Sequence, residues 1–432
     1  MNKINEKYFP VKNGELYIEG IRAAELAGSF GTPLFVYSKS FMRDRIAEIR
    51  DEFLDRYDGT FAAYAGKAFL VTEMCRLADE EGLCLDVVSP GEFFTAKRAG
   101  FPAERIVYHG NNKTYEELDN IIQAGVGRLI IDGLDELDMV DEIVSKHGLV
   151  QTVCFRITPE VKVDTHDHIT TGQRDSKFGI PTDDHILYPL IKRVIDNPNI
   201  MLQGLHFHIG SQLFDAVPYV KATEKVLEVV KEIKDRFDFT VPEIIIGGGY
   251  GIRYTDKDER KPYSHFLDPV MDCVKKFCET YDFPQIHVGI EPGRSIVGEA
   301  GVTLYTIGTV KQIPDGKKFV SIDGGMSDNI RPALYGAEYE AVIANKAEEP
   351  RSDVVTICGR LCESGDRILE DAKIAHAARG DILCVFSTGA YGYSMANNYN
   401  KIQKPAVVFV EGNDAKLVVR RQSLEEMTSS EI

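Results

Sequence analysis

A lysine at the end of an apolar stretch is the residue best placed to do chemistry in this chain of 432 residues. The stretch Phe61–Ala65 reads as a short strand, and Gly66 and Lys67 follow it directly. Burying an ammonium group is costly unless the amine is neutral or paired. An amine held there can form a Schiff base with a carbonyl compound. Alternatively, the side chain of Lys67 simply extends from the strand end into water.

Two histidines and a serine follow a later apolar stretch. His206 and His208 alternate with apolar residues, so they lie on one face of the predicted strand, and Ser211 comes shortly after. The two rings can bind a metal ion, although no third ligand stands near them in the sequence. Alternatively, one ring packs in the core, the other stacks on a planar ligand, and Ser211 donates a hydrogen bond to an anion.

A run of glycines ends another apolar stretch. Gly247, Gly248 and Gly249 are consecutive, and Gly251 follows after one residue. Consecutive glycines expose backbone N–H groups and let a phosphate group approach closely. The run is not a dinucleotide fingerprint, because Ile252 stands where a third small residue is needed. A tight turn is the alternative interpretation.

The eighth apolar stretch ends in a carboxylate and a guanidinium, in the sequence Glu291-Pro292-Gly293-Arg294. These groups can form a structural ion pair, or they can serve a ligand that has a protonated ring nitrogen and anionic groups. Taken with Lys67, the histidines and the glycines, they match the four needs of pyridoxal 5'-phosphate. Those needs are an amine for the imine, a group on the ring face, a phosphate cradle and a partner for the pyridine nitrogen.

The elements that must position these residues follow one repeating pattern from about residue 36 to residue 295. Short apolar stretches alternate with amphipathic ones, which predicts a parallel sheet, most simply a (β/α)8 barrel of the TIM type; an open doubly wound sheet is the alternative. In such a barrel the carboxyl ends of the strands form the active site. The eight stretches are Phe61–Ala65, Leu85–Val88, Ile106–His109, Leu129–Asp132, Thr152–Ile157, Gly204–His208, Ile244–Gly247 and Ile286–Glu291.

The texture of the sequence changes after residue 295. Apolar stretches separated by turns predict a C-terminal antiparallel β domain over residues 296–432. Leu16–Ile18 and Thr32–Tyr37 are expected to add strands to it, so residues 1–35 are assigned to the same domain. We expect this β-rich domain to contribute substrate-binding and dimer-interface residues.

The charge, the apolar runs and the cysteines of the sequence argue against a nucleic-acid partner, a membrane span and a metal site. The net charge of -17 argues against nucleic acid, whose phosphates attract the opposite sign. Met1–Glu6 carries no apolar segment of a leader, and no run of about 18 apolar residues occurs, so a cytoplasmic protein without a membrane span is expected. The pair Cys358 and Cys362 has no second cysteine pair or close histidine, so no metal site is expected there.

The motifs together resemble the fold-type III pyridoxal-phosphate-dependent decarboxylases. The resemblance extends over nearly the whole chain, and the motifs follow in the order of that family. They are Tyr64–Ala68, Asp86–Glu92, Asp175–Gly179, His206–Gln212, Gly247–Gly249, Glu291–Arg294, Arg331–Tyr335, Cys362–Asp366 and Ala390–Ser394.

The resemblance implies how the cofactor would be held. Lys67 would carry it through a Schiff base, His208 would stack on the ring, and Glu291 would pair with the pyridine nitrogen. The phosphate would be bound by Ser211, by the backbone of Gly247, Gly248 and Gly249, and by the segment Pro292-Gly293-Arg294.

The resemblance also implies a substrate site that two subunits share. Arg294, Arg331 and Tyr335 would grip a distal carboxylate, and Glu363 would bind the distal ammonium group. Tyr391 would contact both cofactor and substrate, and Cys362 would protonate the α-carbon. In this family Cys362 and Glu363 reach in from the partner subunit, so the expected active unit is a homodimer.

The charge of Glu291 favours one reaction over another. A carboxylate keeps the pyridine nitrogen protonated and so strengthens electron withdrawal, whereas related racemases place an arginine in that role. The expected reaction is therefore decarboxylation. A substrate with a distal amino-acid head group needs a reader for its anion and one for its cation, which the resemblance assigns to Arg331–Tyr335 and Glu363, so the expected conversion is meso-2,6-diaminopimelate to L-lysine. The alternatives are a carboxynorspermidine-type or an ornithine/arginine-type decarboxylase, a Schiff-base aldolase and a non-catalytic homologue that binds pyridoxal phosphate.

Overall fold

The structure is a computed structural model that describes residues 6–161 and 176–432. Asp175, the first residue of one of the motifs above, lies outside the described residues. The chain forms two compact units. One consists of Ile46–Gly251 and Arg260–Gly293, and the other of Met1–Arg45, Ile252–Glu259 and Arg294–Ile432.

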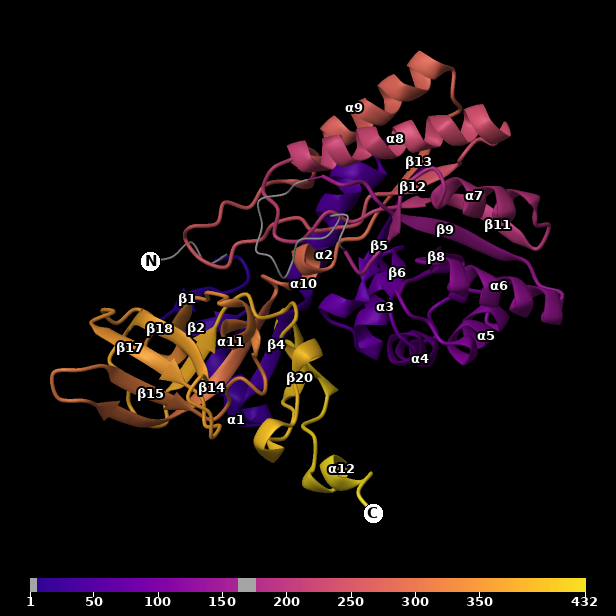
Figure 1. The fold of residues 1–432 in the computed structure, drawn as a ribbon. Helices are drawn as coiled ribbons and strands as arrows, with labels where there is room; N and C mark the ends of the chain where they lie inside the picture. Colours follow the sequence, from indigo (N-terminus) through magenta and orange to yellow (C-terminus); the bar gives the residue numbers. More distant parts are fainter. Residues whose placement is uncertain (1–5, 162–175) are drawn as a thin grey trace. The chain divides into compact units, whose positions relative to one another are not determined.

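The first unit is a closed barrel of eight parallel strands (Figure 1). Each strand pairs with its neighbour in chain order, and the last strand pairs with the first, through Val288 beside Thr60. This closure confirms the predicted (β/α)8 barrel and excludes an open sheet. The strands are β5 (Thr60–Ala65), β6 (Cys84–Val87), β7 (Ile106–Tyr108), β8 (Arg128–Ile131), β9 (Gln151–Thr158), β11 (Ile200–His206), β12 (Glu243–Ile245) and β13 (His287–Ile290). A short strand, β10 (Ile180–Pro181), pairs in parallel with the last two residues of β9, Ile157 and Thr158.

Helices lie outside these strands (Figure 1), and several of them bury one face. In α7, for example, the buried residues Leu187, Leu190, Ile191 and Val194 follow the spacing of a single helix face. Thr114 and Glu117 form a capping box that starts α5. The barrel helices are α3 (Thr72–Glu80), α4 (Pro90–Ala99), α5 (Tyr115–Gln123), α6 (Leu134–His147), α7 (Leu187–Asp196), α8 (Val217–Phe237) and α9 (Tyr263–Tyr281). The chain enters this unit within α2 (Lys39–Ile49).

An ion pair closes the amino end of the barrel. Arg128 and Glu243 begin β8 and β12, and the guanidinium donates two hydrogen bonds to the carboxylate, of 2.8 and 2.7 Å. The Glu243 side chain is 1% exposed, and the guanidinium lies 4.3 Å from the centre of the Phe61 ring. This bidentate geometry satisfies both charges at the end of the barrel opposite the motif residues.

Substituting Glu243→Gln leaves Arg128 without its charged partner. We expect the free energy of unfolding to fall by about 3 kcal/mol, because breaking a buried pair leaves an uncompensated charge. Urea denaturation measures the loss. The matched control is Asp196→Asn, which breaks the exposed pair of Asp196 with Lys192 and should change stability far less. Equal effects of the two substitutions would contradict the structural role given to Glu243.

The second unit is built on a sheet of mostly antiparallel strands. The long strand β14 pairs with β15, β19 and β4, and so lies at its centre. The strands are β4 (Leu34–Ser38), β14 (Gly301–Gln312), β15 (Lys318–Ile322), β16 (Ala341–Ile343), β17 (Asp353–Cys358), β18 (Arg367–Ile374), β19 (Ile382–Val385), β20 (Ala406–Glu411) and β21 (Asp414–Val419). Its helices are α1 (Ala23–Phe30), α10 (Arg294–Val297), α11 (Arg331–Tyr335) and α12 (Leu424–Thr428).

The N-terminal residues join this unit in two different ways. The stretch Thr32–Tyr37, as predicted, supplies a strand of the large sheet, since β4 pairs with β14 and β20. The stretch Leu16–Ile18 instead lies in a separate small sheet of β1 (Val11–Lys12), β2 (Glu15–Ile18) and β3 (Ile21–Arg22). The pairs β4–β20 and β15–β17 are parallel, which the predicted antiparallel domain did not include. Long connections allow these parallel pairs, because each joins strands far apart in the chain.

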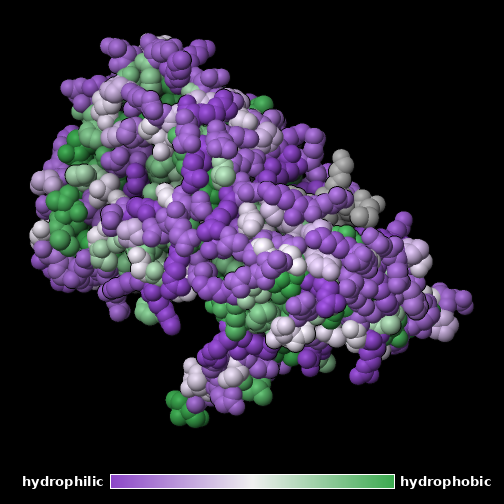
Figure 2. Space-filling model, turned by 180° about the vertical axis from the view of Figure 1, so that it is seen from behind, coloured by the Kyte–Doolittle hydropathy of each residue, from purple (hydrophilic) through white to green (hydrophobic). Residues whose placement is uncertain are grey.

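The surface is polar over most of the face shown in Figure 2, with apolar side chains in small groups. Among the described residues, no helix is both long enough and apolar enough to cross a lipid bilayer.

Candidate active site

Lys67 lies at the carboxyl end of the first barrel strand. A short turn, Gly66–Ala68, follows β5, and in it Gly66 and Ala68 are buried while the Lys67 side chain is exposed. The backbone N–H of Ala65 donates to the carbonyl of Pro292, at 3.1 Å. A Cβ on Gly293 would lie 2.9 Å from the Cβ of Ala65. The turn that carries Lys67 is therefore packed against the segment that follows β13.

The glycine run forms a close-fitting loop at the end of β12. A Cβ on Gly248 would lie 2.1 Å from the carbonyl oxygen of Glu291, and one on Gly249 would lie 2.2 Å from that of Gly210. Gly249 also has a φ of +103°, a conformation that side chains with a Cβ rarely adopt. The residues Gly247–Gly249 must therefore be glycines, and their backbone is bare of side chains, as a phosphate cradle requires.

His208 and Ser211 belong to the loop that follows β11, beside the glycine run. A Cβ on Gly247 would lie 2.6 Å from Nδ1 of His208, and the backbone N–H of Leu213 donates to the carbonyl of Gly249 at 2.9 Å. Burial, reinforced by the positive charge of Lys67, holds the pKa of His208 well below its ordinary value. The ring is therefore neutral at neutral pH, which suits stacking on an aromatic ligand. The expected phosphate contact of Ser211 stays a prediction.

Glu291 is held between two imidazole rings. Nε2 of His109 lies 2.8 Å from Oε1 of Glu291, and Nε2 of His206 lies 2.9 Å from Oε2. All three side chains are buried. Burial acts to raise the pKa of Glu291, but His109 and His206 outweigh it and hold that pKa well below its ordinary value. The carboxylate is therefore ionised inside the barrel, and each ring donates an N–H to one of its oxygens.

The three side chains of His109, His206 and Glu291 are also the candidates for a metal site that includes His206. The nitrogen and oxygen atoms that could bind a metal ion all lie within 4.8 Å of one another, so His109 would be the third ligand, which the sequence did not reveal. Two contacts of 2.8 and 2.9 Å are ordinary hydrogen-bond distances, whereas two atoms bound to one tetrahedral zinc ion lie about 3.3 Å apart. Burial lowers the pKa of His206 to about 4, which keeps its ring neutral. The geometry favours the interpretation that His206 is a packing histidine.

Two acidic side chains, Asp86 and Glu92, lie close enough to Lys67 for its charge to affect their pKa values. Burial raises the pKa of Asp86, while His109 and Lys67 act against that rise. Burial likewise raises the pKa of Glu92 to about 7, although the backbone N–H of Val88 donates to its carboxylate at 2.8 Å. Glu92 can therefore exchange a proton near neutral pH. Neither acid was predicted as a site residue, although both belong to the motif Asp86–Glu92.

The raised pKa of Glu92 has a consequence for stability. Below its ordinary value of 4.5, Glu92 is protonated in the folded and the unfolded chain alike. As the pH rises from 4.5 towards 7, only the unfolded chain ionises, so stability falls, and it levels off above that range. Glu92→Gln removes this ionisation but keeps an oxygen that accepts from Val88. Between about pH 5 and about pH 8, the wild type should lose roughly 2 kcal/mol relative to the variant. Chemical denaturation across this range measures the difference, and parallel curves would refute it.

Removing the imidazole of His109 should weaken the function of Glu291. His109→Leu deletes one of two charge-assisted hydrogen bonds, worth about 1.5–3 kcal/mol, so we expect kcat to fall roughly 10- to 100-fold. The affinity of the apoprotein for cofactor, measured by fluorescence titration, should fall with it.

The matched control for His109 is His147→Asn. That residue also contacts a carboxylate in the barrel unit, Asp119 at 2.7 Å, but it lies on the surface. The control should leave kcat and cofactor affinity unchanged. An unaltered kcat in His109→Leu would show that Glu291 does not need this donor.

The β-rich unit gathers a second set of charges. Arg294 and Arg331 are buried, and each residue is only 8% exposed. Arg294 donates through Nη1 to the hydroxyl of Tyr254, and its guanidinium lies 4.7 Å from the centre of the Tyr391 ring. Arg331 donates through Nη1 to the hydroxyl of Tyr339, at 2.5 Å. Of the predicted substrate residues, Arg294, Arg331 and Tyr391 thus belong to one cluster; Tyr254 and Tyr339 were not predicted.

Tyr335 and Tyr391 differ in what the structure shows of them. Tyr335 ends α11 and is half-buried, and its expected contact with substrate stays a prediction. Tyr391 has a φ of +59°, which is uncommon for a residue with a side chain. Such backbone strain collects at functional sites, where the surrounding structure enforces it.

Cys362 and Glu363 lie in an exposed loop of the same unit. Both residues are exposed, and the backbone N–H of Cys362 donates to Oδ1 of Asn400 at 2.7 Å. The buried carboxylate of Asp366 fixes the loop by accepting the N–H groups of Met326, at 2.6 Å, and Leu361, at 2.9 Å. The loop is thus anchored from within, while its two predicted functional side chains point to the outside.

The fold and these strand-end groups define the class of the protein. A family model described as pyridoxal-dependent decarboxylase, pyridoxal binding domain, matches residues 43–298. That range contains every strand of the barrel and the residues Lys67, His208 and Glu291. The prediction of a pyridoxal-phosphate enzyme is confirmed.

Individual relatives place the chain more narrowly. It is 45% identical to the diaminopimelate decarboxylase of Bacillus subtilis, over 98% of this chain and 96% of the relative. A crystal structure of diaminopimelate decarboxylase from M. jannaschii in complex with L-lysine matches with a TM-score of 0.93 and 33% identity, over 99% and 98% of the two chains. The Helicobacter pylori enzyme, also complexed with L-lysine, matches with a TM-score of 0.86 and 27% identity, over 94% and 98%. The chain belongs to the diaminopimelate decarboxylase family, whose members are carboxy-lyases.

The residues present fit pyridoxal phosphate. The barrel supplies an exposed amine on Lys67 and a neutral ring on His208. It also supplies the backbone of Gly247–Gly249, where an added Cβ would clash with neighbouring atoms, and an ionised carboxylate on Glu291. An ionised carboxylate next to a pyridine nitrogen favours its protonated form. These groups come from the ends of β5, β11, β12 and β13, which are consecutive around the ring.

Proposed function

We propose that this enzyme removes one carboxylate of meso-2,6-diaminopimelate as CO2 and releases L-lysine. The observation that carries the proposal is the cluster of two buried guanidiniums, Arg294 and Arg331, each of which donates a hydrogen bond to a tyrosine hydroxyl. Two buried guanidiniums in one cluster favour an anionic ligand. A substrate with a second amino-acid head group brings such an anion, whereas a simple diamine precursor does not.

The reacting end of the substrate is assigned to the barrel residues. Lys67 would be the point of covalent attachment, and His208 would hold the ring face. Pyridoxal phosphate supplies an aldehyde for the amines and a ring that accepts the electron pair left when CO2 departs. Glu291 would keep the ring nitrogen protonated, since its own carboxylate stays ionised between His109 and His206. Ser211, Gly247–Gly249 and Gly293 would orient the phosphate.

The remaining groups are assigned to a homodimer with shared active sites. Cys362 would return a proton to the α-carbon, and Glu363 would bind the distal ammonium group. Both side chains are exposed on a loop that Asp366 anchors, which supports contact with a second copy of the chain. Arg294 and Arg331, with Tyr335, would bind the distal carboxylate. A cytoplasmic location also stays a prediction.

Release of L-lysine from meso-diaminopimelate by the purified holoenzyme tests the reaction. We expect stoichiometric L-lysine and CO2, and turnover of carboxynorspermidine, L-ornithine and L-arginine at less than about one-hundredth of that rate, because none of them presents the same distal head group to both an anion and a cation reader. Chromatography of the products measures both. Faster release of a polyamine than of L-lysine would contradict the proposal.

Borohydride reduction followed by peptide mapping is the control on the site. The pyridoxyl group should be found on the peptide that contains Lys67. Lys113 is the matched comparison, since it also lies near a strand end but is buried, with its amine 2.6 Å from Oε1 of Glu136. A label on Lys113 would show that the assigned attachment point is wrong.

A further inference from the structure

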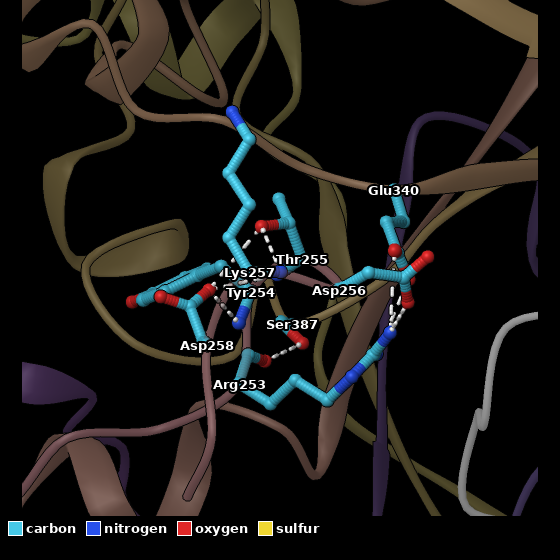
Figure 3. Close-up of polar contacts among 8 residues, drawn as sticks. All are labelled: Arg253, Tyr254, Thr255, Asp256, Lys257, Asp258, Glu340 and Ser387. Carbon is cyan, nitrogen blue, oxygen red and sulfur yellow. Dashed lines mark hydrogen bonds and ion pairs between the residues drawn. The ribbon is translucent and has the colours of Figure 1, made fainter.

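The short segment Ile252–Glu259 is tied to the β-rich unit by polar contacts on both sides of Tyr254 (Figure 3). Arg253 forms two hydrogen bonds of 3.2 Å with the carboxylate of Glu340, and its carbonyl accepts a hydrogen bond from the Ser387 hydroxyl, at 2.9 Å. The segment Ile252–Glu259 is therefore tied to two separate parts of this unit just before Tyr254. It follows the glycine run in the sequence without a break.

The carboxylate of Asp258 holds the segment in place on the C-terminal side of Tyr254. Oδ2 of Asp258 accepts the backbone N–H groups of Tyr254, at 3.0 Å, and Thr255, at 2.9 Å (Figure 3). Asp and Asn side chains commonly stabilise turns in this way. With anchors on both sides, the Tyr254 side chain has a defined direction.

That direction leads into the arginine cluster. Tyr254 is 8% exposed, and its hydroxyl accepts a hydrogen bond from Nη1 of Arg294. The guanidinium of Arg331 lies 4.9 Å from the centre of its ring. The ring of Tyr339 meets it edge-on, with centres 5.5 Å apart and planes at 86°. Tyr254 therefore lies between the two cations that are assigned to the distal carboxylate.

The hydroxyl of Tyr254 can still donate one hydrogen bond. A phenol has one hydrogen to donate and lone pairs to accept with, whereas a guanidinium only donates. In the described residues, the hydroxyl of Tyr254 has guanidinium partners, so it accepts from them and keeps its own hydrogen for another acceptor. Burial acts to raise the pKa of Tyr254, but Arg294 and Arg331 outweigh it and lower that pKa. A more acidic phenol is a stronger hydrogen-bond donor to an anion.

We infer that Tyr254 is a specificity-determining residue, whose hydroxyl donates to the distal carboxylate of the substrate while Arg294 and Arg331 bind the same group. This inference rests on the proposed function. It assigns the carboxylate three donors from three segments of the chain, namely the turn at Tyr254, α10 and α11. Tyr254 therefore contributes to choosing an amino-acid head group over a plain amine.

Tyr254→Phe removes the donor and keeps the ring. The test compares L-lysine with cadaverine, the diamine that lacks its carboxylate, as inhibitors of the holoenzyme. Loss of a hydrogen bond to a charged group should raise the inhibition constant of L-lysine about tenfold or more, and the KM of meso-diaminopimelate with it. The constant for cadaverine should stay within about twofold. Tyr57→Phe is the matched control, since it also deletes one hydroxyl contact, with Asp268 at 2.8 Å, away from the cluster.

Each outcome has a definite meaning. An unchanged constant for L-lysine overturns the inference, and so does an equal rise for L-lysine and cadaverine, which would indicate a general change in the site. Failure of the proposed function is recognised separately, because the wild-type enzyme would then release no L-lysine.

A measurement on the wild-type holoenzyme covers the case in which the variant does not fold. Tyrosinate absorbance is followed against pH with each inhibitor bound. A carboxylate placed beside Tyr254, Arg294, Arg331 and Tyr339 should shift the lowest tyrosine titration upwards with L-lysine and not with cadaverine. Identical titrations with the two inhibitors would overturn the inference.

Discussion

The ionised carboxylate of Glu291 is the group on which the barrel site depends. A buried charge is unfavourable unless donors compensate for it, and here His109 and His206 each donate to one of its oxygens. Those donors come from the ends of β7 and β11, so closure of the barrel is what brings them to β13. The neutral state of His206 follows from the same burial, which lowers its pKa to about 4. One carboxylate thus links the fold with the protonation states of its neighbours, and in the proposed function also with the electron withdrawal that decarboxylation needs.

The β-rich unit buries two positive charges, those of Arg294 and Arg331, where the barrel buries the negative charge of Glu291. Arg294 and Arg331 contact aromatic rings and phenol oxygens, which interact with guanidiniums favourably. Two guanidiniums in one buried cluster attract an anionic ligand. Glu291 and Arg294 are three residues apart in the chain, so the negative group proposed to serve the cofactor and the positive group proposed to serve the substrate come from one short segment.

Much of this arrangement could be predicted from the sequence. The alternation of apolar and amphipathic stretches predicted the barrel, and strand-end motifs predicted the cofactor. Residues whose roles depend on contacts distant in sequence were missed. His109 follows the third strand like any strand-end polar residue, and nothing local connects it with Glu291, which lies 182 residues further on. Tyr254 reads as part of a loop after the glycines, and its packing against Arg331 could not be predicted from spacing. The parallel pairs β4–β20 and β15–β17 were missed for the same reason.

The sequence by itself determined which chemical groups are available and, through the period of its apolar residues, which local elements carry them. Short-range physics is sufficient for that, because strand alternation, helix faces and glycine runs depend on neighbouring residues. The tertiary structure alone decided which groups meet: two histidines on one carboxylate, and two arginines around one tyrosine. It also decided protonation, since burial raises the pKa of Glu92 to about 7 while donors keep Glu291 ionised. Two glutamates with the same intrinsic acidity acquire different charges because their surroundings differ, and those surroundings exist only after the chain has folded.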